Sequence, residues 1–316
     1  MRPPARLAAF GGALAVVVGC GAGLGAAIGP LDVGADAEGA HDAAHEAAPA
    51  ETTPADGGTH EGTAHQAGAA TATDRPGGLA VAEGGYRLDV PVTTFAGGTP
   101  LTFDLRVLDA AGDPVTRFAV EHEKRLHLVV VGRDLVDYAH VHPTLAPDGT
   151  WTAAVPALPA DSYRAFADFR PAGGDALTLG VDLTVTGEAA PDALPEPSHH
   201  ADVDGYRVDL AGDVRTGTSE LAFTVRRGAD VVRTDPYLGA AGHLVAIREG
   251  DMAYLHVHPI EGDGHSVRFA AELPSPGRYR LFLDFAHGGA VHTAAFTVEV
   301  PEAGAPPAAA DDHGGH

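Results

Sequence analysis

An internal repeat constrains the fold of this chain more than any other feature of its sequence. Residues 127–169 align without a gap to residues 243–285 at a constant offset of 116, and 14 of the 43 aligned positions are identical. Upstream, the match resumes with YRLD from Tyr86 against YRVD from Tyr206. The 316 residues therefore contain two duplicated domains, each of about 95 to 105 residues.

Each copy is built from short runs of β-branched and aromatic residues that Gly, Pro and Asp turns separate, and no long helical period interrupts them. The runs in the first copy are YRLDVPV, LTFDLRVL, RFAVEHE, RLHLVVV, DYAHVHP, WTAAVP, YRAFADF and LGVDLTV. Seven or eight such strands in about 100 residues predict an all-β fold, an antiparallel immunoglobulin-like β-sandwich, with a barrel as the alternative. Tyr163 and Tyr279 each follow a turn at the start of a late strand, the place of a tyrosine corner, which favours the sandwich.

Composition divides the chain into six segments. Residues 79–187 and 205–300 are the two sandwich repeats, and a Pro-rich acidic linker, residues 188–204, joins them. Residues 31–78 are rich in Ala, Gly and acidic residues without apolar periodicity, so we expect a disordered tether. Residues 301–316 form a His-containing tail for which we expect disorder too, and residues 1–30 are a signal anchor or signal peptide.

The N-terminal segment predicts export. Leu7–Ile28 is uncharged and long enough to span a bilayer, and Arg2 and Arg6 precede it. We expect an uncleaved single-span anchor in the cell membrane, with everything after Pro30 outside the cytoplasm. A cleaved signal peptide and a lipoprotein signal at Cys20 are the alternatives.

Charge and residue usage exclude several classes of partner and site. With 20 Lys+Arg against 43 Asp+Glu the net charge is −23, so nucleic acid is not an expected partner. The single cysteine excludes an intrachain disulfide and a cysteine-based zinc or iron–sulfur site. With two methionines the chain cannot build a Met-rich Cu(I) site, and no nucleotide-binding or nucleophile motif lies in the right context. Any bound metal must therefore use some of the 18 histidines.

Both repeats contain one histidine block, HLVVVGRDLVDYAHVHP in residues 127–143 and HLVAIREGDMAYLHVHP in residues 243–259. Residues two apart on a strand point to the same face, so each Tyr-x-His-x-His run places its three ring side chains together. Hairpin turns centred near residues 134–135 and 250–251 then place one further histidine of each copy opposite the last histidine of its run. We therefore expect His127 to face His142, and His243 to face His258.

This register predicts a three-histidine metal site in each sandwich. The predicted ligands are His127, His140 and His142 in the first copy and His243, His256 and His258 in the second. Imidazole triads of this kind suit Zn(II) and Cu(II), and a one-residue shift of register would dissolve them. The alternative is that the histidines pack in a polar seam against Tyr138 and Tyr254 and bind the backbone.

The second repeated block, YRAFADF and YRLFLDF, places an acidic residue in an otherwise apolar strand. We expect Asp168 and Asp284 to orient a ligand histidine or to complete the coordination, or else to pair with Arg164 or Arg280. Four other histidines lack a counterpart in the opposite copy and are expected at the surface, with His292 the best extra ligand among them: His122, His265, His287 and His292.

The repeated Y-x-H-V-H-P and Y-R-x-F-x-D-F motifs resemble those of exported, often actinobacterial, tandem β-sandwich proteins. More distantly, residues 85–300 are similar to YtkA-like and CopC-like immunoglobulin-fold domains of bacterial envelopes. The CopC-like resemblance implies copper handling outside the cytoplasm, with an N-terminal histidine ligand that has no counterpart here. What carries over is the interpretation of His127, His140, His142 and their repeats as ligands.

The sequence thus predicts a membrane-anchored extracytoplasmic protein that binds or buffers copper or zinc and is not an enzyme. A structural module that docks another envelope protein, with packed histidines, is the alternative. A hydrolase or lyase that uses a zinc-bound water on three histidines is a third hypothesis, but neither its pocket nor its general base can be named.

Overall fold

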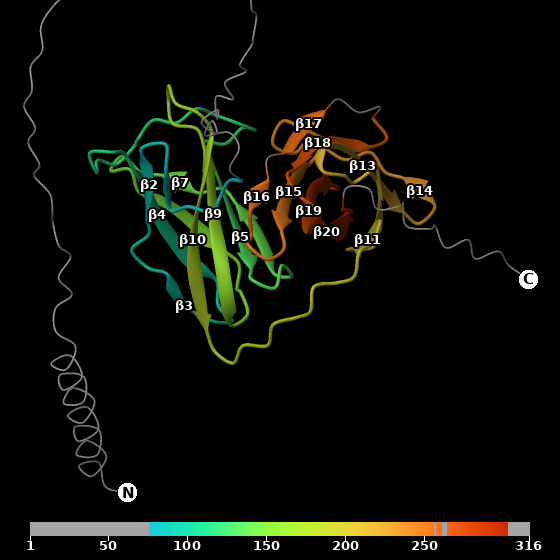
Figure 1. Ribbon diagram of the computed structural model, residues 1–316, viewed down its shortest axis with the longest axis horizontal. Helices are drawn as coiled ribbons and strands as arrows, with labels where there is room; N and C mark the ends of the chain where they lie inside the picture. The colour runs from blue at the N-terminus through green and yellow to red at the C-terminus, as the bar shows by residue number, and fades with distance from the viewer. Residues whose placement is uncertain (1–75, 256, 261–263, 303–316) are drawn as a thin grey trace, which may run out of the picture. The chain divides into compact units, whose positions relative to one another are not determined.

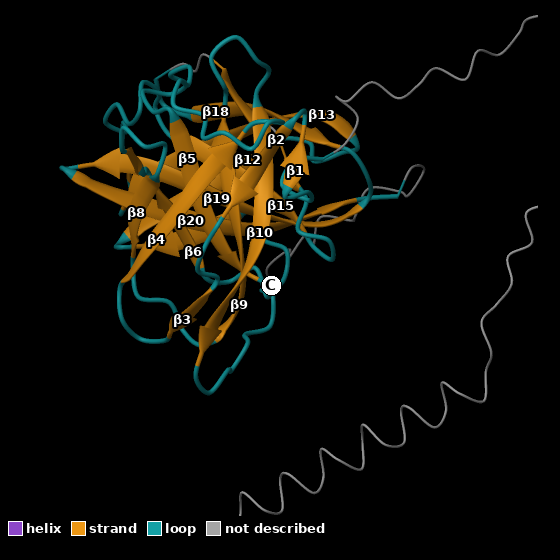
Figure 2. Cartoon of the chain, turned by 90° about the vertical axis from the view of Figure 1, so that its left-hand side faces the viewer, coloured by secondary structure: helices purple, strands orange, loops and turns teal. Residues whose placement is uncertain are grey.

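The computed structural model describes residues 76–302, except residue 256 and residues 261–263. The predicted anchor with Cys20, most of the tether and the tail after residue 302 lie outside the described residues. Within the described ranges the chain forms strands and loops (Figure 2), and no helix there is long and apolar enough to cross a membrane. The described residues belong to one compact unit.

The first repeat forms two five-stranded sheets with the strand orders β1-β2-β4-β8-β7 and β3-β10-β9-β5-β6 (Figure 1). Its strands are β1 (Ala82–Glu83), β2 (Tyr86–Asp89), β3 (Thr94–Ala96), β4 (Leu101–Leu108), β5 (Leu126–Gly132), β6 (Tyr138–Val141), β7 (Thr144–Leu145), β8 (Trp151–Val155), β9 (Asp161–Phe169) and β10 (Leu177–Thr186). Alternate residues of β4 and β8 face a core that contains Phe103 and Trp151, while intervening residues face solvent. The parallel pairing of β3 with β10 is the exception to an otherwise antiparallel sandwich.

The second repeat forms two sheets with the orders β11-β12-β13-β18-β17 and β16-β15-β19-β20, and β14 pairs with β13. Its strands are β11 (His200–Val203), β12 (Tyr206–Ala211), β13 (Gly217–Arg227), β14 (Asp230–Val231), β15 (His243–Arg248), β16 (Tyr254–Leu255), β17 (Val257–Ile260), β18 (Val267–Leu273), β19 (Gly277–His287) and β20 (Ala290–Val300). β11 lies inside the segment expected to be a linker and pairs with β12, so the second sandwich begins at His200.

The fold class is the predicted one, two tandem immunoglobulin-like antiparallel β-sandwiches. Both predicted tyrosine corners are present. The Tyr163 hydroxyl donates to the carbonyl oxygen of Pro159 at 3.0 Å, and the Tyr279 hydroxyl donates to that of Ser275 at 2.7 Å. Both tyrosines are fully buried, so these bonds fix the loop that precedes β9 or β19 to the core.

The hairpin registers predicted from the turn positions are confirmed. Val129 pairs with His140 in the first copy, and Ala246 pairs with Leu255 in the second. The second hairpin ends at Leu255, however, and β17 pairs with β18 of the other sheet, where His258 lies opposite Ala270. The expectation that His258 faces His243 is therefore wrong, because β17 takes its hydrogen bonds from β18 and not from β15.

Besides its two sandwich cores the chain has a third apolar cluster, which takes residues from both repeats. Its buried members are Val129, Val131, Leu135 and Phe166 of the first repeat and Val245, Ile247, Met252 and Phe282 of the second. All seven residues of β5 are buried, because one face covers the core of the first sandwich and the other face lies in this cluster. We call this third cluster the inter-repeat core.

Candidate metal site

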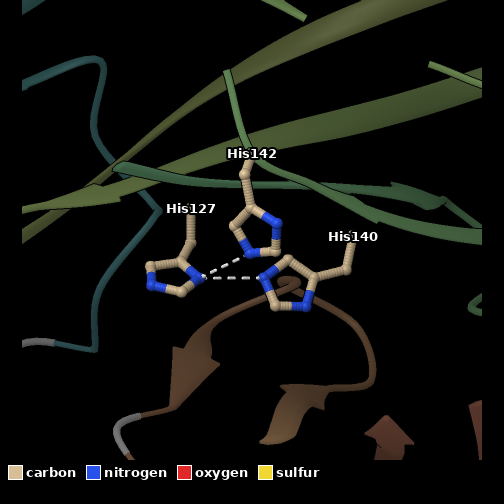
Figure 3. Close-up of side chains that lie close together, drawn as sticks. All are labelled: His127, His140 and His142. Carbon is tan, nitrogen blue, oxygen red and sulfur yellow. Dashed lines mark hydrogen bonds between the residues drawn. The ribbon is translucent and has the colours of Figure 1, made fainter. Parts of the chain in front are cut away.

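Three histidines of the first repeat converge at one end of the β5–β6 hairpin. His127 Nδ1 lies 3.1 Å from His140 Nε2 and 3.2 Å from His142 Nε2. Figure 3 shows these ring nitrogens pointing toward one another. His127 is on β5, His140 is on β6, and His142 follows the end of β6, so the confirmed register brings them together. Among the described residues, these three are the group whose potential ligand atoms all lie within 4.8 Å of one another.

The outer hydrogen bonds of two of these rings fix their tautomers. His127 Nε2 lies 3.2 Å from the carbonyl oxygen of Glu121, which can only accept, so this nitrogen carries the hydrogen. His140 Nδ1 likewise donates to a carboxylate oxygen of Asp284 at 2.8 Å. In the neutral rings, His127 Nδ1 and His140 Nε2 therefore both present lone pairs toward the point where the three imidazoles meet.

Burial lowers the pKa of two histidines of the triad, His127 and His142. The pKa of His127 is lowered to about 3, first by desolvation, since the residue is 6% exposed, and then by the neighbouring His140. The pKa of His142 is also lowered to about 3, by desolvation and then by His140. Because a histidine must be neutral to bind a metal ion, both rings are in the ligating form at neutral pH.

Two further histidines extend the cluster toward the surface. The His243 ring lies 5.8 Å from that of His127 and 6.2 Å from that of His140, between ring centroids. The exposed His122 ring lies 5.0 Å from His243. Desolvation, followed by the charges of His140 and His122, lowers the pKa of His243 to about 4. His243 thus lies beside the triad of the first repeat, and His122, which is exposed as expected, lies beside His243.

A cavity of about 150 Å³ opens at this cluster. Its lining includes His122, His127, His140, His243, His258 and Asp168. Residues of both repeats therefore surround the histidine cluster, whereas the sequence predicted a separate site within each sandwich.

The two repeated acidic residues lie close to the cluster. Asp284 pairs with His243 in the β15–β19 ladder, and its carboxylate accepts hydrogen bonds from His140, from the Tyr138 hydroxyl at 3.0 Å and from Thr293 at 2.6 Å. It thus contacts a histidine of the opposite repeat, His140, and not one of its own. Asp168 pairs with His127 in the β5–β9 ladder and accepts a hydrogen bond from Thr178.

The arginines on the same two strands have other partners. Arg164 forms an ion pair with Asp182 at 2.7 Å, and Arg280 donates to the Thr297 hydroxyl at 2.9 Å. Of the two contacts expected for Asp284, the structure shows the one with a histidine, His140, whereas Arg280 contacts Thr297.

The remaining predicted ligands lie elsewhere or outside the described residues. His256 is not among the described residues, so the second triad stays a prediction. His258 is exposed on β17. His292, the expected extra ligand, forms a 2.7 Å contact with the carboxylate of Asp204. His287 forms a hydrogen bond with the Tyr206 hydroxyl. His265 is exposed, as expected.

Sequence reasoning missed that a site would take residues from both repeats. A signal for this was present, since RLHLVVV and YRLFLDF are nearly continuous apolar runs rather than alternating ones. Such runs are typical of strands that are buried on both faces. The face of β5 that carries His127 therefore had to be covered by something outside its own sandwich.

Fold and site together define a class: an all-β protein of two immunoglobulin-like sandwiches with a partly buried histidine cluster. The chain belongs to the family described as "Domain of unknown function (DUF8832)", whose profile matches residues 80–187 and residues 201–302. The two matches are the two repeats. No curated protein matches the chain.

Several solved structures match the chain at low similarity. The Escherichia coli adhesin FdeC is 16% identical, with 71% of this chain and 66% of that chain covered and a TM-score of 0.24. Invasin, a bacterial integrin-binding protein, is 14% identical over 70% of this chain and 41% of that chain, with a TM-score of 0.23. Domains 5-6 of the S-layer protein SbsC are 13% identical, with 68% of this chain and 95% of that chain covered and a TM-score of 0.22. This chain thus spans less than two thirds of the adhesin structure, and likeness at this level carries no argument about activity.

Proposed function

We propose that this protein binds one Cu(II) or Zn(II) ion through His127 Nδ1, His140 Nε2 and His142 Nε2. The observation that carries the proposal is the convergence of these three nitrogens, together with outer hydrogen bonds that hold two of the rings with their lone pairs inward. Histidines that merely pack would gain more from donating to one another than from presenting two acceptors at 3.1 Å.

The distances from His127 Nδ1 to the other two nitrogens suit a metal ion. With metal–nitrogen bonds of about 2.0–2.1 Å, the edges of a tetrahedral site are about 3.3 Å long. The contacts of His127 with His140 and His142, at 3.1 and 3.2 Å, are close to this value. A bound cation would replace the repulsion between facing lone pairs with three coordinate bonds.

The donor set favours borderline metal ions. Three imidazoles suit Zn(II) and Cu(II), and the ordering of divalent affinities favours copper when both are present. The described residues include no cysteine, so a thiolate that would select Cu(I) is not offered by this part of the chain. Three protein ligands leave one coordination position for water, an exogenous ligand or His243.

The expected setting is the outer face of the cell envelope. The apolar segment Leu7–Ile28, with arginines before it, supports export and anchoring, and the resemblance of the repeated motifs to YtkA-like and CopC-like domains supports metal handling there. A buried three-histidine site suits metal buffering or handling. The second candidate, a module that docks another envelope protein, requires no metal and serves as the alternative outcome of the test.

Metal titration of the purified full chain in detergent tests the proposal. We expect one tight equivalent of Cu(II) or Zn(II) that is lost in the double variant His127→Ala/His140→Ala. Histidines outside the described residues are present in both proteins, so their weak binding cancels in the comparison. The matched control is His287→Ala/His292→Ala, which removes two histidines that contact Tyr206 and Asp204 and should keep the tight equivalent. A tight equivalent that the His127→Ala/His140→Ala variant retains would overturn the proposed site, and no tight equivalent in any of the three proteins would favour the docking module.

A further inference from the structure

The carboxylate of Asp284 belongs to the second repeat, but two of its hydrogen-bond donors belong to the first. Its backbone pairs with His243 in β15, whereas its Oδ2 accepts from His140 Nδ1 at 2.8 Å and from the Tyr138 hydroxyl at 3.0 Å. The side chains of His140 and Asp284 are 4% and 3% exposed. This contact between the repeats is therefore almost fully shielded from water.

A buried carboxylate is costly unless hydrogen bonds compensate for its lost hydration. The bond from Thr293 on β20 is internal to the second repeat and has a counterpart in the first, where Asp168 accepts from Thr178. This threonine contact therefore stabilises the strand pair in both copies. The contacts to His140 and Tyr138 are of a different kind, because they tie the carboxylate to a ring that faces the histidine cluster.

A carboxylate that accepts from the outer nitrogen of a ligand histidine has two effects on a metal site. It holds the ring in one orientation and tautomer, and it makes the inner nitrogen a better donor to the metal. Asp284 satisfies the geometry for both effects, since His140 Nδ1 faces it and His140 Nε2 faces His127.

We infer that Asp284 is a positioning residue for the metal site of the first repeat, so that this site is complete only while the two repeats are packed together. The inference rests on the proposed function, because it assigns the second repeat a role in the same site. Metal binding and the docking of the repeats are then linked: an ion that prefers the docked state must stabilise docking to the same extent.

The packing around this contact gives the linkage a physical basis. The Tyr138 ring stacks on Phe282 with centroids 4.1 Å apart and an interplanar angle of 11°. Tyr138 therefore lies on the inter-repeat core while its hydroxyl binds the carboxylate that orients His140. A displacement of the second repeat would remove both the stacking partner of Tyr138 and the acceptor of His140.

The two hairpin turns support the same conclusion. Leu135 and Met252, at the turns of the two copies, have φ angles of 62° and 59°, a left-handed conformation that is strained for residues other than glycine. Both side chains are only 2% exposed, in the inter-repeat core. Packing between the repeats offsets this backbone strain, so the docked state is built into both hairpins.

Replacement of Asp284 by Asn in the full chain tests the positioning role. The amide keeps the volume but removes the charge, and we expect Zn(II) or Cu(II) affinity to fall about 10- to 100-fold with the stoichiometry unchanged. With Co(II) as a probe, the visible d–d absorption should shift, because the ligand field that His140 Nε2 exerts on the metal changes. If the substitution only reduced the amount of folded protein, the spectrum of the Co(II) that still binds would not change. The matched control is Asp204→Asn, which breaks the contact of the exposed Asp204 carboxylate with His292 in the second repeat and should leave affinity and spectrum unchanged.

Hydrogen exchange tests the linkage between the repeats. Zn(II) should slow the exchange of β15 and β19 amides in the wild-type chain, although neither strand holds a residue of the triad. In the Asp284→Asn chain this protection should be lost, while metal still slows exchange in β5 and β6. If metal protects only the first repeat in the wild type, the linkage is refuted.

A second variant keeps the test decisive should Asp284→Asn fail to fold. Phe282→Leu removes the ring on which Tyr138 stacks and touches no histidine of the triad, and it should also lower metal affinity. Unchanged affinity in a folded variant of either kind overturns the inference and leaves the proposed function intact. A wild-type chain that binds no metal overturns the proposed function and the inference with it.

Discussion

The imidazoles of His127 and His140 meet nitrogen to nitrogen at 3.1 Å, and this contact is the strongest local constraint on what the protein does. Each ring has its hydrogen on the far side, one bound to the Glu121 carbonyl and the other to the Asp284 carboxylate. A proton between the two rings would relieve the repulsion only by charging one of them. Burial opposes that charge, as the pKa of His127, about 3, indicates. A divalent cation relieves the repulsion without this difficulty.

This balance predicts how the metal-free protein responds to acid. The folded-state pKa values of His127 and His142 are about 3, against 6.5 for an ordinary histidine, so below about pH 6.5 the unfolded chain binds protons that the folded chain does not. The free energy of unfolding is therefore not reduced by these histidines above pH 6.5, and it falls progressively as the pH is lowered toward 3. Urea unfolding midpoints in chelator-treated protein between pH 7.5 and 5 check this. A His127→Gln/His142→Gln variant should show a flatter pH dependence; equal slopes would contradict the prediction.

At the scale of elements, the hairpins show what the sequence determines. The Asp-Leu and Gly-Asp turns fixed the β5–β6 and β15–β16 registers correctly, and the YR motifs marked both tyrosine corners, because turn chemistry and side-chain period are local properties. The strand that pairs with the segment around His258 could not be predicted from local sequence. Its V-H-P run is identical in both copies, and nothing in the alternation specifies whether β17 takes hydrogen bonds from β15 or from β18.

The tyrosine corner of the first repeat gives a prediction on this scale. The buried Tyr163 hydroxyl lies 3.0 Å from both the Pro159 carbonyl oxygen and an Asp137 carboxylate oxygen, and these two acceptors share its one hydrogen. Tyr163→Phe leaves both acceptors without this donor, and we expect the free energy of unfolding to fall by about 1–3 kcal/mol. Urea denaturation of the metal-free chain measures it. Thr102→Val, at an exposed position of β4, serves as the control. A loss below about 0.5 kcal/mol would show that the corner does not hold the loop before β9.

At the scale of the whole molecule, the duplication predicted two equal sandwiches but not their joint core. Self-comparison identifies what the copies share, whereas the inter-repeat core depends on which outer faces meet, and equivalent residues such as Phe166 and Phe282 occupy it from both sides. The histidines then lose their equivalence: the first copy contributes the triad, and the second contributes His243 beside it and Asp284 behind it. Only the nearly continuous apolar character of β5 and of the middle of β19 signalled that a second face would be buried.

The shared core predicts that the two sandwiches unfold together. Each has a complete core of its own, so a variant that removes only the inter-repeat core should leave two folded but independent domains. Phe166→Ala empties that core of a fully buried ring, a change that typically costs about 3–5 kcal/mol. Calorimetry of the metal-free chain should then show one transition in the wild type and two in the variant.

The control for this experiment is Val92→Ala, at a residue that is 53% exposed, and it should keep the single transition. Added Zn(II) gives a further test. An ion that binds only the docked form raises the melting temperature of a transition in which both sandwiches unfold together. In the wild type we expect zinc to shift the whole transition upward, whereas in Phe166→Ala the melting of the second repeat should no longer respond to zinc. Two transitions in the wild type, or one zinc-dependent transition in Phe166→Ala, would show that the inter-repeat core does not couple the sandwiches.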